Sequence, residues 1–424
     1  MKNFLVILSL FCFGFLGSVQ AKHFAVLVAG SNMFYNYRHQ SDIFHAYQIL
    51  TGYGIDPENI ITFAYDDIAQ DPENPVKGKV YNKPSDGEGK DVYAGVKIDY
   101  KGEDVTPKNF IAVLEGNSEA VNGKKVLESG EKDHVFIYFA DHGATGLIAF
   151  PNEYLYADDF IKALKDMNSK KKYSQMVVYI EACESGSMFN KILPENITIY
   201  ATTASNPDES SWATYCSPND VVNGVEIGSC LGDLYSVNFL ENLESSDPNK
   251  ETLLKQFQVV KKKTTASHVM QYGDLALDKE VIGEFEGNST DADALVKNER
   301  EDLSKYTSLV DSRYVKLAYL QRRHARLGSV ESEANLAEEM RSIKKFDESF
   351  ESLSSMLRLN VDEKVDGINF GCLKQRVAMY EEVCGKFSDY GLKYIRYLHF
   401  SCVQGVDVYD FEEALIKSCG VIDM

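Results

Sequence analysis

Two apolar strand patterns that each end in a chemically reactive residue constrain the fold of this chain most. The run 134–140 is followed directly by Asp-His-Gly at 141–143, and the run 177–182 leads into Cys183 and a Ser/Gly loop. If the two runs are parallel neighbours in one sheet, they lie about 5 Å apart. Their carboxyl ends then meet at one sheet edge, where open α/β sheets place ligands and chemistry. The pattern therefore brings together the thiol of Cys183 and the imidazole of His142, a nucleophile and its acid/base partner.

The rest of the chain predicts alternating strands and helices, followed by a helical part. Strand patterns also cover 23–29, 60–64 and 197–202, and helix patterns cover 40–51, 107–114, 157–167, a segment starting near 233, and 252–262. This order predicts an α/β domain over 22–287 with a mainly parallel sheet and helices on both faces. The segment 66–105, rich in Asp, Gly, Pro and Lys, is expected to be a long surface excursion.

A change of composition marks a second domain. Residues 288–300 are small, acidic and polar, which is typical of a linker. Residues 301–424 are charged, fit amphipathic helices at 322–324, 331–341 and 374–386, and are almost free of strand signals. We therefore expect a separate all-α domain at the C-terminus.

The first 21 residues have the pattern of a secretory signal peptide. Lys2 precedes the apolar run 4–16, and Val19-Gln20-Ala21 offers a cleavage site after Ala21. A membrane anchor is the alternative, but the run is too short to span a bilayer comfortably, and no later stretch reaches ~18 apolar residues. We therefore expect a chain without a membrane span that enters the secretory pathway, where the sequons at Asn196 and Asn288 can be glycosylated.

The cysteines single out one thiol. Cys12 leaves with the signal peptide, and in an oxidising compartment six others should pair: Cys216 and Cys230 in one polar loop, and a C-terminal group of Cys372, Cys384, Cys402 and Cys419. Cys183 is then left over. Such a thiol either bridges another chain or is reactive, and its position after a strand favours reactivity.

The overall charge bears on partners. The formal net charge is −20 and the pI about 4.9. A nucleic-acid partner requires a basic face, so this balance argues against one. The chain would be closer to neutrality in an acidic compartment such as a lysosome or a digestive lumen, although charge alone does not establish the location.

The pair of Cys183 and His142 suits acyl transfer. A thiolate attacks a carbonyl, an imidazole protonates the leaving amine, and the amides of Gly143 and Cys183 can hold the oxyanion. One alternative is a buried free cysteine beside a structural histidine. Another is a zinc site that includes Asp141, but no second Cys or His follows at ligand spacing. No metal or other cofactor is expected.

Longer motifs give a family resemblance. The segments that carry it are Glu181-Ala182-Cys183-Glu184-Ser185-Gly186-Ser187-Met188, Phe139-Ala140-Asp141-His142-Gly143, Tyr35-Asn36-Tyr37-Arg38-His39-Gln40, Tyr65-Asp66-Asp67-Ile68-Ala69, Gly102-Glu103-Asp104-Val105-Thr106-Pro107, Leu231-Gly232-Asp233-Leu234-Tyr235-Ser236-Val237 and Ser267-His268-Val269-Met270-Gln271-Tyr272-Gly273. Together they resemble the legumains, or asparaginyl endopeptidases, densely over about 23–285. The C-terminal four-cysteine region resembles the inhibitory prodomain of that family more loosely.

The resemblance implies a caspase-like sheet and a cysteine peptidase that cuts peptides and proteins after Asn. It makes Cys183 the nucleophile, His142 the general acid/base and Asn36 the residue that orients the imidazole. Without it, Asn36 would be interpreted as a turn residue. The Asp at 141 matches a family position that can cyclise to a succinimide linked to ligase activity.

A pocket that recognises an Asn side chain needs donors for its carbonyl and acceptors for its NH₂ group. Arg38 supplies donors and Glu181 and Asp233 supply acceptors, and these match the pocket positions of the family, with His39, Ser210 and Ser211 beside them. The alternative for Arg38 and Asp233 is a surface ion pair or a helix cap. An Asp substrate should be cut only at acidic pH, when its carboxyl is protonated.

The C-terminal part is expected to inhibit the enzyme until it is removed. The resemblance implies the disulfides Cys372–Cys402 and Cys384–Cys419, and a further bridge Cys216–Cys230 that only some branches of the family have. An exposed Asn in the linker is needed for self-cleavage. Asn298 is preferred over Asn288, because a glycan on Asn288 would block cleavage. We expect the helical domain to cover the site at neutral pH and to leave on acidification. Cystatin-type inhibitors are further implied partners.

Three rival interpretations remain. The same fold can act mainly as a peptide ligase, which product analysis with an added peptide amine distinguishes. The related transamidase that attaches lipid anchors should carry a C-terminal membrane span, and the sequence has none. A non-catalytic binding module would be expected to lose Cys183, His142 or Asn36, yet all three are present.

Overall fold

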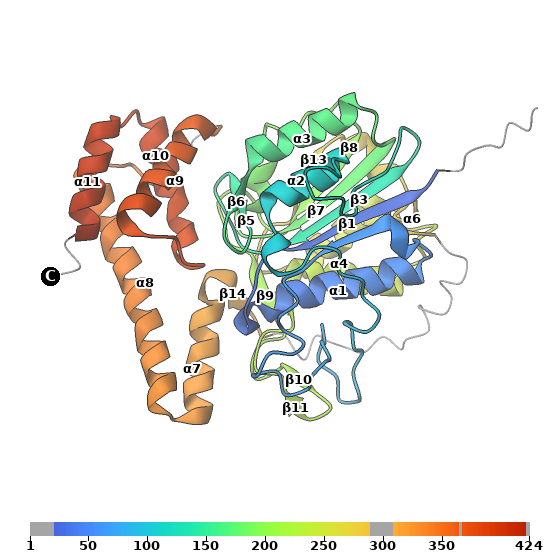
Figure 1. The fold of residues 1–424 in the computed structure, drawn as a ribbon, viewed down its shortest axis with the longest axis horizontal. Coiled ribbons are helices and arrows are strands. Elements are labelled where there is room, and N and C mark those ends of the chain that lie inside the picture. The colour runs from blue at the N-terminus through green and yellow to red at the C-terminus, as the bar shows by residue number, and fades with distance from the viewer. Residues whose placement is uncertain (1–20, 289–307, 364–366, 421–424) are drawn as a thin grey trace, which may run out of the picture.

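The computed structural model describes residues 21–288, 308–363 and 367–420. Its centre is a six-stranded sheet in the order β13-β8-β7-β3-β1-β2 (Figure 1). Neighbouring strands are parallel except for β13, which runs antiparallel to β8 at one edge. The mainly parallel sheet predicted from the alternating pattern is thus confirmed.

The elements have the following bounds. The strands are β1 (His23–Ala29), β2 (Ile60–Phe63), β3 (His134–Ala140), β4 (Gly143–Ala144), β5 (Leu147–Ala149), β6 (Tyr154–Tyr156), β7 (Gln175–Glu181), β8 (Ile199–Thr203), β9 (Trp212–Thr214), β10 (Val221–Val222), β11 (Val225–Glu226), β12 (Gly232–Asp233), β13 (Met270–Gly273) and β14 (Val310–Asp311). The helices are α1 (Tyr37–Gly52), α2 (Pro107–Glu115), α3 (Ala157–Ser169), α4 (Leu234–Ser245), α5 (Leu253–Lys263), α6 (Gly283–Glu286), α7 (Val315–Leu327), α8 (Val330–Leu357), α9 (Phe370–Cys384), α10 (Ile395–Val403) and α11 (Val408–Gly420).

Helices cover both faces of the sheet because its central strands are apolar on both sides. In Figure 1, α2 and α3 lie above the sheet and α1 and α4 below it. Successive side chains of β3 alternate between the two layers: Phe136 and Tyr138 pack with α1 and α4, while Val135 and Ile137 pack with α2 and α3. Local signals set the helix starts. Thr106 caps α2 by accepting the amide of Asn109, and Pro107 occupies the first turn.

Three features differ from the sequence-based expectations. The segment 66–105 is irregular but is more than a surface excursion, because its apolar residues fill the core; Val80, Tyr81, Val92 and Tyr100 are buried. Helix α1 begins three residues earlier than predicted, at Tyr37. The short strand β14 lies in a segment expected to be free of strands, because it pairs with β9 of the α/β domain rather than with a neighbour in sequence.

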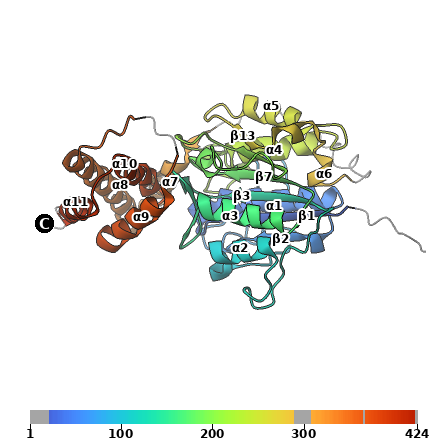
Figure 2. The ribbon, with the colours of Figure 1, turned by 90° about the horizontal axis from the view of Figure 1, so that it is seen from above.

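The helical C-terminal part packs against one end of the α/β domain, as both views show (Figures 1 and 2). The disulfides Cys372–Cys402 and Cys384–Cys419 tie α9 to α10 and α11. These are the pairs that the resemblance implies. The apolar core of the helical C-terminal part includes β4 and β5 residues of the α/β domain, among them Leu147. The two parts therefore share a buried apolar interface.

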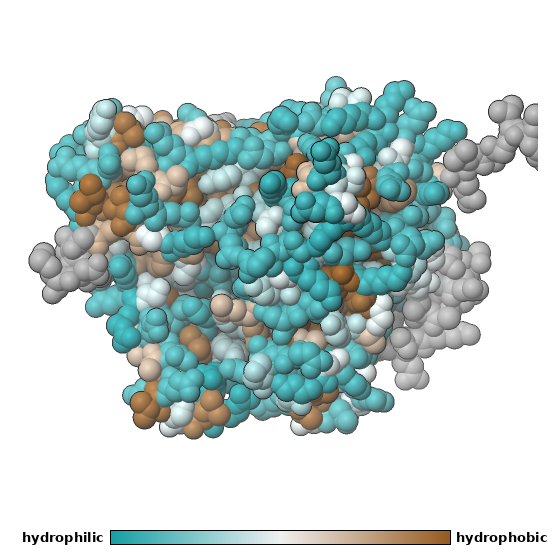
Figure 3. Space-filling model, viewed as in Figure 1, coloured by the Kyte–Doolittle hydropathy of each residue, from teal (hydrophilic) through white to brown (hydrophobic). Residues whose placement is uncertain are grey.

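The surface is mostly hydrophilic, with apolar residues concentrated on the helical part in the view of Figure 3. Within the described ranges, none of the helices combines the length and the apolar character needed to cross a bilayer. The predicted signal peptide lies almost entirely outside the described residues.

Candidate active site

The ends of β3 and β7 place His142 and Cys183 at the same sheet edge. The two strands are parallel and paired in register up to Ala140 and Glu181, and the amide of Asp141 donates to the Glu181 carbonyl at 3.1 Å. His142 and Cys183 each come two residues after the last paired residue of their strand. A Cβ atom on Gly143 would lie 2.4 Å from the Cys183 carbonyl oxygen. Only glycine fits where the two strand ends approach this closely.

The orientation of the His142 ring is set by Asn36. Nε2 of His142 lies 3.0 Å from Oδ1 of Asn36, and that oxygen also accepts from Nη1 of Arg38 at 3.2 Å. The Asn36 amide nitrogen donates to the Asn32 carbonyl, so the amide orientation is defined. Nε2 therefore carries the proton. Nδ1 is buried and has no hydrogen-bond partner among the described residues, which leaves it as the basic nitrogen.

Cys183 is a free, fully buried thiol. Its sulfur accepts the Ser211 amide at 3.3 Å and lies 3.6 Å from the Ser211 hydroxyl. Burial raises the pKa of Cys183 to about 11, although the nearby Arg313 opposes the shift. The sulfur is therefore a protonated thiol in this state, and thiols are far weaker nucleophiles than thiolates.

Arg38, Glu181 and Asp233 converge behind this pair, and we call them the specificity cluster. Nε of Arg38 donates to Oδ1 of Asp233 at 2.8 Å, and all three side chains are at most 1% exposed. The amide and hydroxyl of Ser236 hold Oε2 of Glu181. The helix-cap alternative for Asp233 does not hold, because its side chain makes no cap hydrogen bond to α4.

The specificity cluster carries three unpaired polar atoms. Nη2 of Arg38, Oε1 of Glu181 and Oδ2 of Asp233 are buried without a hydrogen-bond partner in the described part of the chain. Buried polar atoms are usually paired, so these three are available to bind a polar group of another molecule. The set comprises one guanidinium donor and two carboxyl oxygens. Burial raises the pKa of both Glu181 and Asp233, and Arg38 opposes the shift. Of the two predicted wall residues, Ser211 is buried and Ser210 is half-buried.

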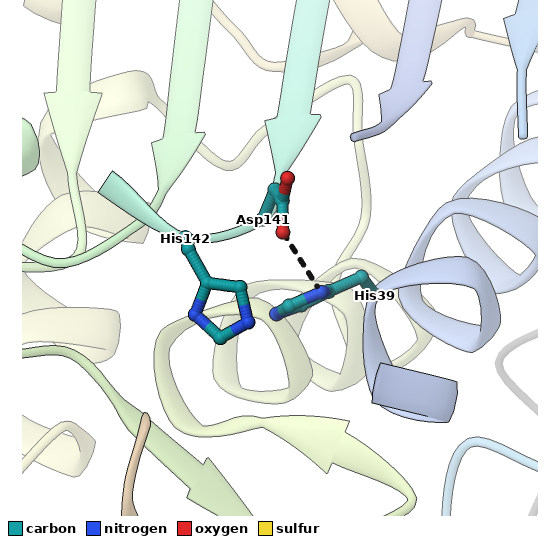
Figure 4. A group of neighbouring side chains, drawn as sticks. All are labelled: His39, Asp141 and His142. Atoms are coloured by element: carbon teal, nitrogen blue, oxygen red, sulfur yellow. Dashed lines mark ion pairs between the residues drawn. The ribbon is translucent and has the colours of Figure 1, made fainter. Parts of the chain in front are cut away.

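His39 and Asp141 lie beside His142 (Figure 4), and His39 also faces Asp233 of the specificity cluster. Nδ1 of His39 lies 3.3 Å from Oδ1 of Asp141 and 2.6 Å from the Ser31 hydroxyl, and Nε2 lies 3.6 Å from Asp233. The rings of His39 and His142 meet edge to face at 5.1 Å. Burial lowers the pKa of His39 and raises that of Asp141.

His39, Asp141 and His142 also have the spacing of metal ligands, with donor atoms within 4.8 Å of one another. Nδ1 of His39 and Nε2 of His142 already make hydrogen bonds, so a metal would have to use the other ring nitrogen of each histidine to leave those bonds intact. Burial also favours the neutral form of Asp141, which is a poor ligand. The geometry fits a hydrogen-bonded cluster rather than a metal site.

A segment from the C-terminal part lies over this site. Strand β14 pairs antiparallel with β9, and the amide of Ser312 donates to the Ser211 carbonyl at 3.1 Å. Arg313 is 3% exposed; it forms an ion pair with Glu184 and donates to the Gly143 carbonyl at 2.6 Å.

From the loop before α10, Oδ2 of Asp389 lies 3.2 Å from Nε2 of His142. Sequence reasoning found neither Arg313 nor Asp389. Both lie in segments without a motif, far along the chain from the residues that they contact.

The remaining predicted positions fall at the edge of the site or away from it. The disulfide Cys216–Cys230 packs with Ala213 of β9 and with Val310 and Val315 of the C-terminal part. Asn196 and Asn288 are exposed. Asn298 lies outside the described residues.

Comparison with known proteins identifies the family of the chain. Residues 23–288 match the model of the Peptidase C13 family, and residues 328–419 match the legumain prodomain. These matches define a cysteine endopeptidase that is made as a zymogen with a C-terminal prodomain. The chain belongs to the Peptidase C13 family.

The relatives extend over most of the chain. The vacuolar-processing enzyme delta-isozyme of Arabidopsis thaliana is 42% identical over 434 residues, covering 95% of this chain and 91% of that protein. The vacuolar-processing enzyme beta-isozyme 1 of Oryza sativa subsp. japonica is 41% identical, covering 93% and 84%. Legumain of Mus musculus is 50% identical over 320 residues, covering 74% and 70%. Among solved structures, caspase-1 from Spodoptera frugiperda matches with a TM-score of 0.38 and 9% identity over 64% of this chain and 92% of that one.

Proposed function

We propose that this peptidase hydrolyses peptide bonds on the carboxyl side of asparagine. The observation that carries the proposal is the set of three unpaired atoms in the specificity cluster. The carbonyl oxygen of an Asn side chain would accept from Nη2 of Arg38. Its NH₂ group would donate one hydrogen to Glu181 and the other to Asp233.

The reaction follows from the protonation state of His142. Nδ1 takes the proton of the Cys183 thiol as the sulfur bonds to the substrate carbonyl carbon, and the amides of Gly143 and Cys183 stabilise the oxyanion. The carbon–nitrogen bond then breaks, and the imidazolium returns the proton to the leaving amine. Water attacks the resulting thioester with Nδ1 as base, which releases the acid and restores the thiol.

The same chemistry accounts for selectivity. A site with buried donors and acceptors penalises a substrate that leaves them unpaired. A charged Asp side chain would face the carboxylates of Glu181 and Asp233, so cleavage after Asp is expected only where that side chain is protonated. A peptide amine in place of water would give ligation at the same thioester, and analysis of products formed with an added peptide amine tests this alternative.

We further propose that residues 310–313 inhibit the enzyme by binding in the position of a substrate. The segment adds a strand to β9, a common mode of peptide recognition. The bond from Ser312 to Ser211, beside Cys183, puts Ser312 at the place of the residue before a scissile bond. Its hydroxyl contacts the Ser211 hydroxyl at 3.2 Å and does not reach the specificity cluster.

Release of this segment would follow self-cleavage in the linker, for which Asn298 remains the predicted site. Relatives named vacuolar-processing enzymes and the acidic composition support an acidic compartment such as a vacuole or lysosome. Cystatin-type inhibitors remain predicted partners.

The experiment uses two peptides that differ only in Asn or Gln at the cleavage position. The full chain is first incubated at about pH 5, and the peptides are then added to the wild type and to a Cys183→Ala variant. We expect cleavage after Asn, at least about 100-fold slower cleavage after Gln, and none by Cys183→Ala. Equal rates on the two peptides would contradict the assignment of the specificity cluster, and cleavage by Cys183→Ala would contradict the nucleophile.

A further inference from the structure

A second layer of polar side chains lies behind the specificity cluster on helix α1. Arg38, Asp42 and His45 are spaced by four and three residues, so they share one face of the helix. Asp42 and His45 are at most 1% exposed. Burying such groups is costly unless each is hydrogen-bonded, so the partners of Asp42 and His45 are informative.

Asp42 holds the backbone of Asp233. Oδ2 of Asp42 accepts the Asp233 amide at 3.1 Å, and Oδ1 accepts from Nδ2 of Asn82 at 2.6 Å. A Cβ atom at Gly232 would lie 3.0 Å from both Oδ1 of Asp42 and Nδ2 of Asn82. The same Cβ atom would lie 2.4 Å from Cγ1 of Val237, so the crowding around this position favours glycine at 232. The hydrogen bond to Asp42 fixes the backbone of Asp233, whose side chain meets Arg38.

The orientation of Asn82 is defined on both sides. Its amide nitrogen faces Asp42, the Ser41 hydroxyl at 3.1 Å and the Leu231 carbonyl at 3.0 Å. Its oxygen lies 2.8 Å from Nδ1 of His45. Both oxygens of Asp42 therefore face N–H donors, and Nδ1 of His45 carries a proton. Burial and the adjacent Asp233 carboxyl raise the pKa of Asp42, and the bonds from the Asn82 side chain and the Asp233 amide oppose that shift.

The chain of contacts continues to the surface. Nε2 of His45 lies 2.9 Å from Oε1 of Glu244, and Nζ of Lys90 lies 3.0 Å from the same oxygen. Burial opposes ionisation of Glu244, but His45, Lys90 and Lys83 outweigh it and hold its pKa well below the usual range. An anionic Glu244 anchors His45, and His45 in turn anchors Asn82.

We propose that Asp42 is a positioning residue that acts through Asp233. Held by Asn82 and His45, it keeps the Asp233 carboxylate at the place where a substrate side chain needs its acceptor. The inference rests on the proposed function, because it concerns recognition of the Asn carboxamide. It predicts that a change at Asp42 weakens use of an Asn substrate while the reactivity of Cys183 is kept.

The test compares Asp42→Asn with the wild type after acid incubation of the full chain. In the variant one acceptor becomes an NH₂ group that must face either the Asp233 amide or the Asn82 amide. A hydrogen bond of a charged group contributes about 1.5–3 kcal/mol, so kcat/KM for an Asn peptide should fall about 10- to 150-fold. We expect most of the loss in KM. Iodoacetamide does not bind the specificity cluster. The rate at which it alkylates Cys183 in Asp42→Asn should therefore stay within about twofold of the wild-type rate.

Two matched variants separate positioning from general damage. In the double variant Asp42→Asn/Asn82→Asp, the exchanged groups can again pair with each other, with the Asp233 amide and with His45. The new carboxylate also faces the Leu231 carbonyl oxygen, so only part of the lost kcat/KM should return. Asp99→Asn makes the same change at a carboxylate that accepts the Thr62 amide at 3.0 Å on the outer strand β2, and it should leave kcat/KM unchanged.

Each outcome for Asp42→Asn either supports the positioning role of Asp42 or overturns it. Equal kcat/KM for Asp42→Asn and the wild type, or an equal loss of peptide cleavage and Cys183 alkylation, would overturn the positioning role. If Asp42→Asn does not fold, His45→Gln carries the test: a loss confined to peptide cleavage supports the inference, and an unchanged kcat/KM overturns it. If the wild type does not cleave the Asn peptide, the proposed function itself fails, which is a different result from a wild type that cleaves and variants that do not differ.

Discussion

Asp389 offers a direct test of how the C-terminal part keeps the enzyme closed. Its Oδ2 lies 3.2 Å from Nε2 of His142 and 3.5 Å from the amide nitrogen of Asn36. Burial opposes ionisation of Asp389, but His142, Lys316 and Arg38 together outweigh it and hold its pKa well below the usual range. The substitution Asp389→Asn keeps the shape and removes the charge.

The size of the effect follows from the contacts. A hydrogen bond that involves a charged group contributes about 1.5–3 kcal/mol, and each 1.4 kcal/mol is a factor of ten in an equilibrium constant. The closed state of Asp389→Asn should therefore open about 10- to 150-fold more often. Asp389 leaves with the prodomain, so the activated variant should have the kcat of the wild type.

Alkylation of Cys183 by iodoacetamide in the full chain measures this opening. The thiol is fully buried and its pKa is raised to about 11 in the closed state, so reaction requires opening. At pH 7, Asp389→Asn should react at least about tenfold faster than the wild type. Asp362→Asn, at an exposed position of the same helical part, is the matched control. A rate for Asp389→Asn within twofold of the control would refute the reasoning.

The equilibrium between the closed and open states depends on pH in a direction that the pKa shifts define. A carboxyl whose pKa is depressed in the closed state favours closure above its ordinary pKa of 3.8, and this contribution is lost as pH falls further. Glu184 acts in the opposite direction: burial, partly offset by Arg313, raises its pKa to about 7 from 4.5, so its protonation favours the closed state. Asp389 therefore contributes to release only below about pH 3.8 and Glu184 does not contribute, so Asp389→Asn should flatten the alkylation profile in that acid range.

Two further predictions concern the inhibitory segment and the stability of the catalytic core. Ser312→Asn should place a carboxamide in reach of the specificity cluster and convert the segment into a substrate. Mass spectrometry should then find a new cut between residues 312 and 313, and this cut should disappear when Cys183→Ala is added. An uncut chain would contradict the substrate-like direction of β14. Glu286 is fully buried, and burial raises its pKa to about 8 from 4.5, although Gln256 opposes this. A raised carboxyl pKa stabilises the fold below 4.5 and loses that contribution as pH rises through 8, by up to about 5 kcal/mol. Glu286→Gln should therefore raise the Tm at pH 8 relative to the wild type while changing it little at pH 4.5, and equal shifts at both pH values would argue against titration of this group.

Local signals in the sequence were sufficient to predict the helices and strands and to bring His142 and Cys183 together. The strand runs that end at His142 and Cys183, the Thr106 cap of α2 and the separate helical region were all predictable, because periodicity and capping depend on neighbouring residues. The cysteine count left Cys183 as the free thiol, because the six other cysteines of the described residues could pair. The catalytic roles of these residues stay predictions until they are measured.

Tertiary structure alone decided which distant groups meet at the site. Arg313 reaches Gly143 across 170 residues of chain, and Asn82 joins Asp42 to the loop that carries Asp233 from an irregular segment without a motif. Such contacts depend on how whole layers pack, and no local pattern records them. The sequence by itself determined the reactive groups and the sheet that carries them. Packing decided that a strand from the C-terminal part covers these groups and that a buried polar layer supports their specificity cluster.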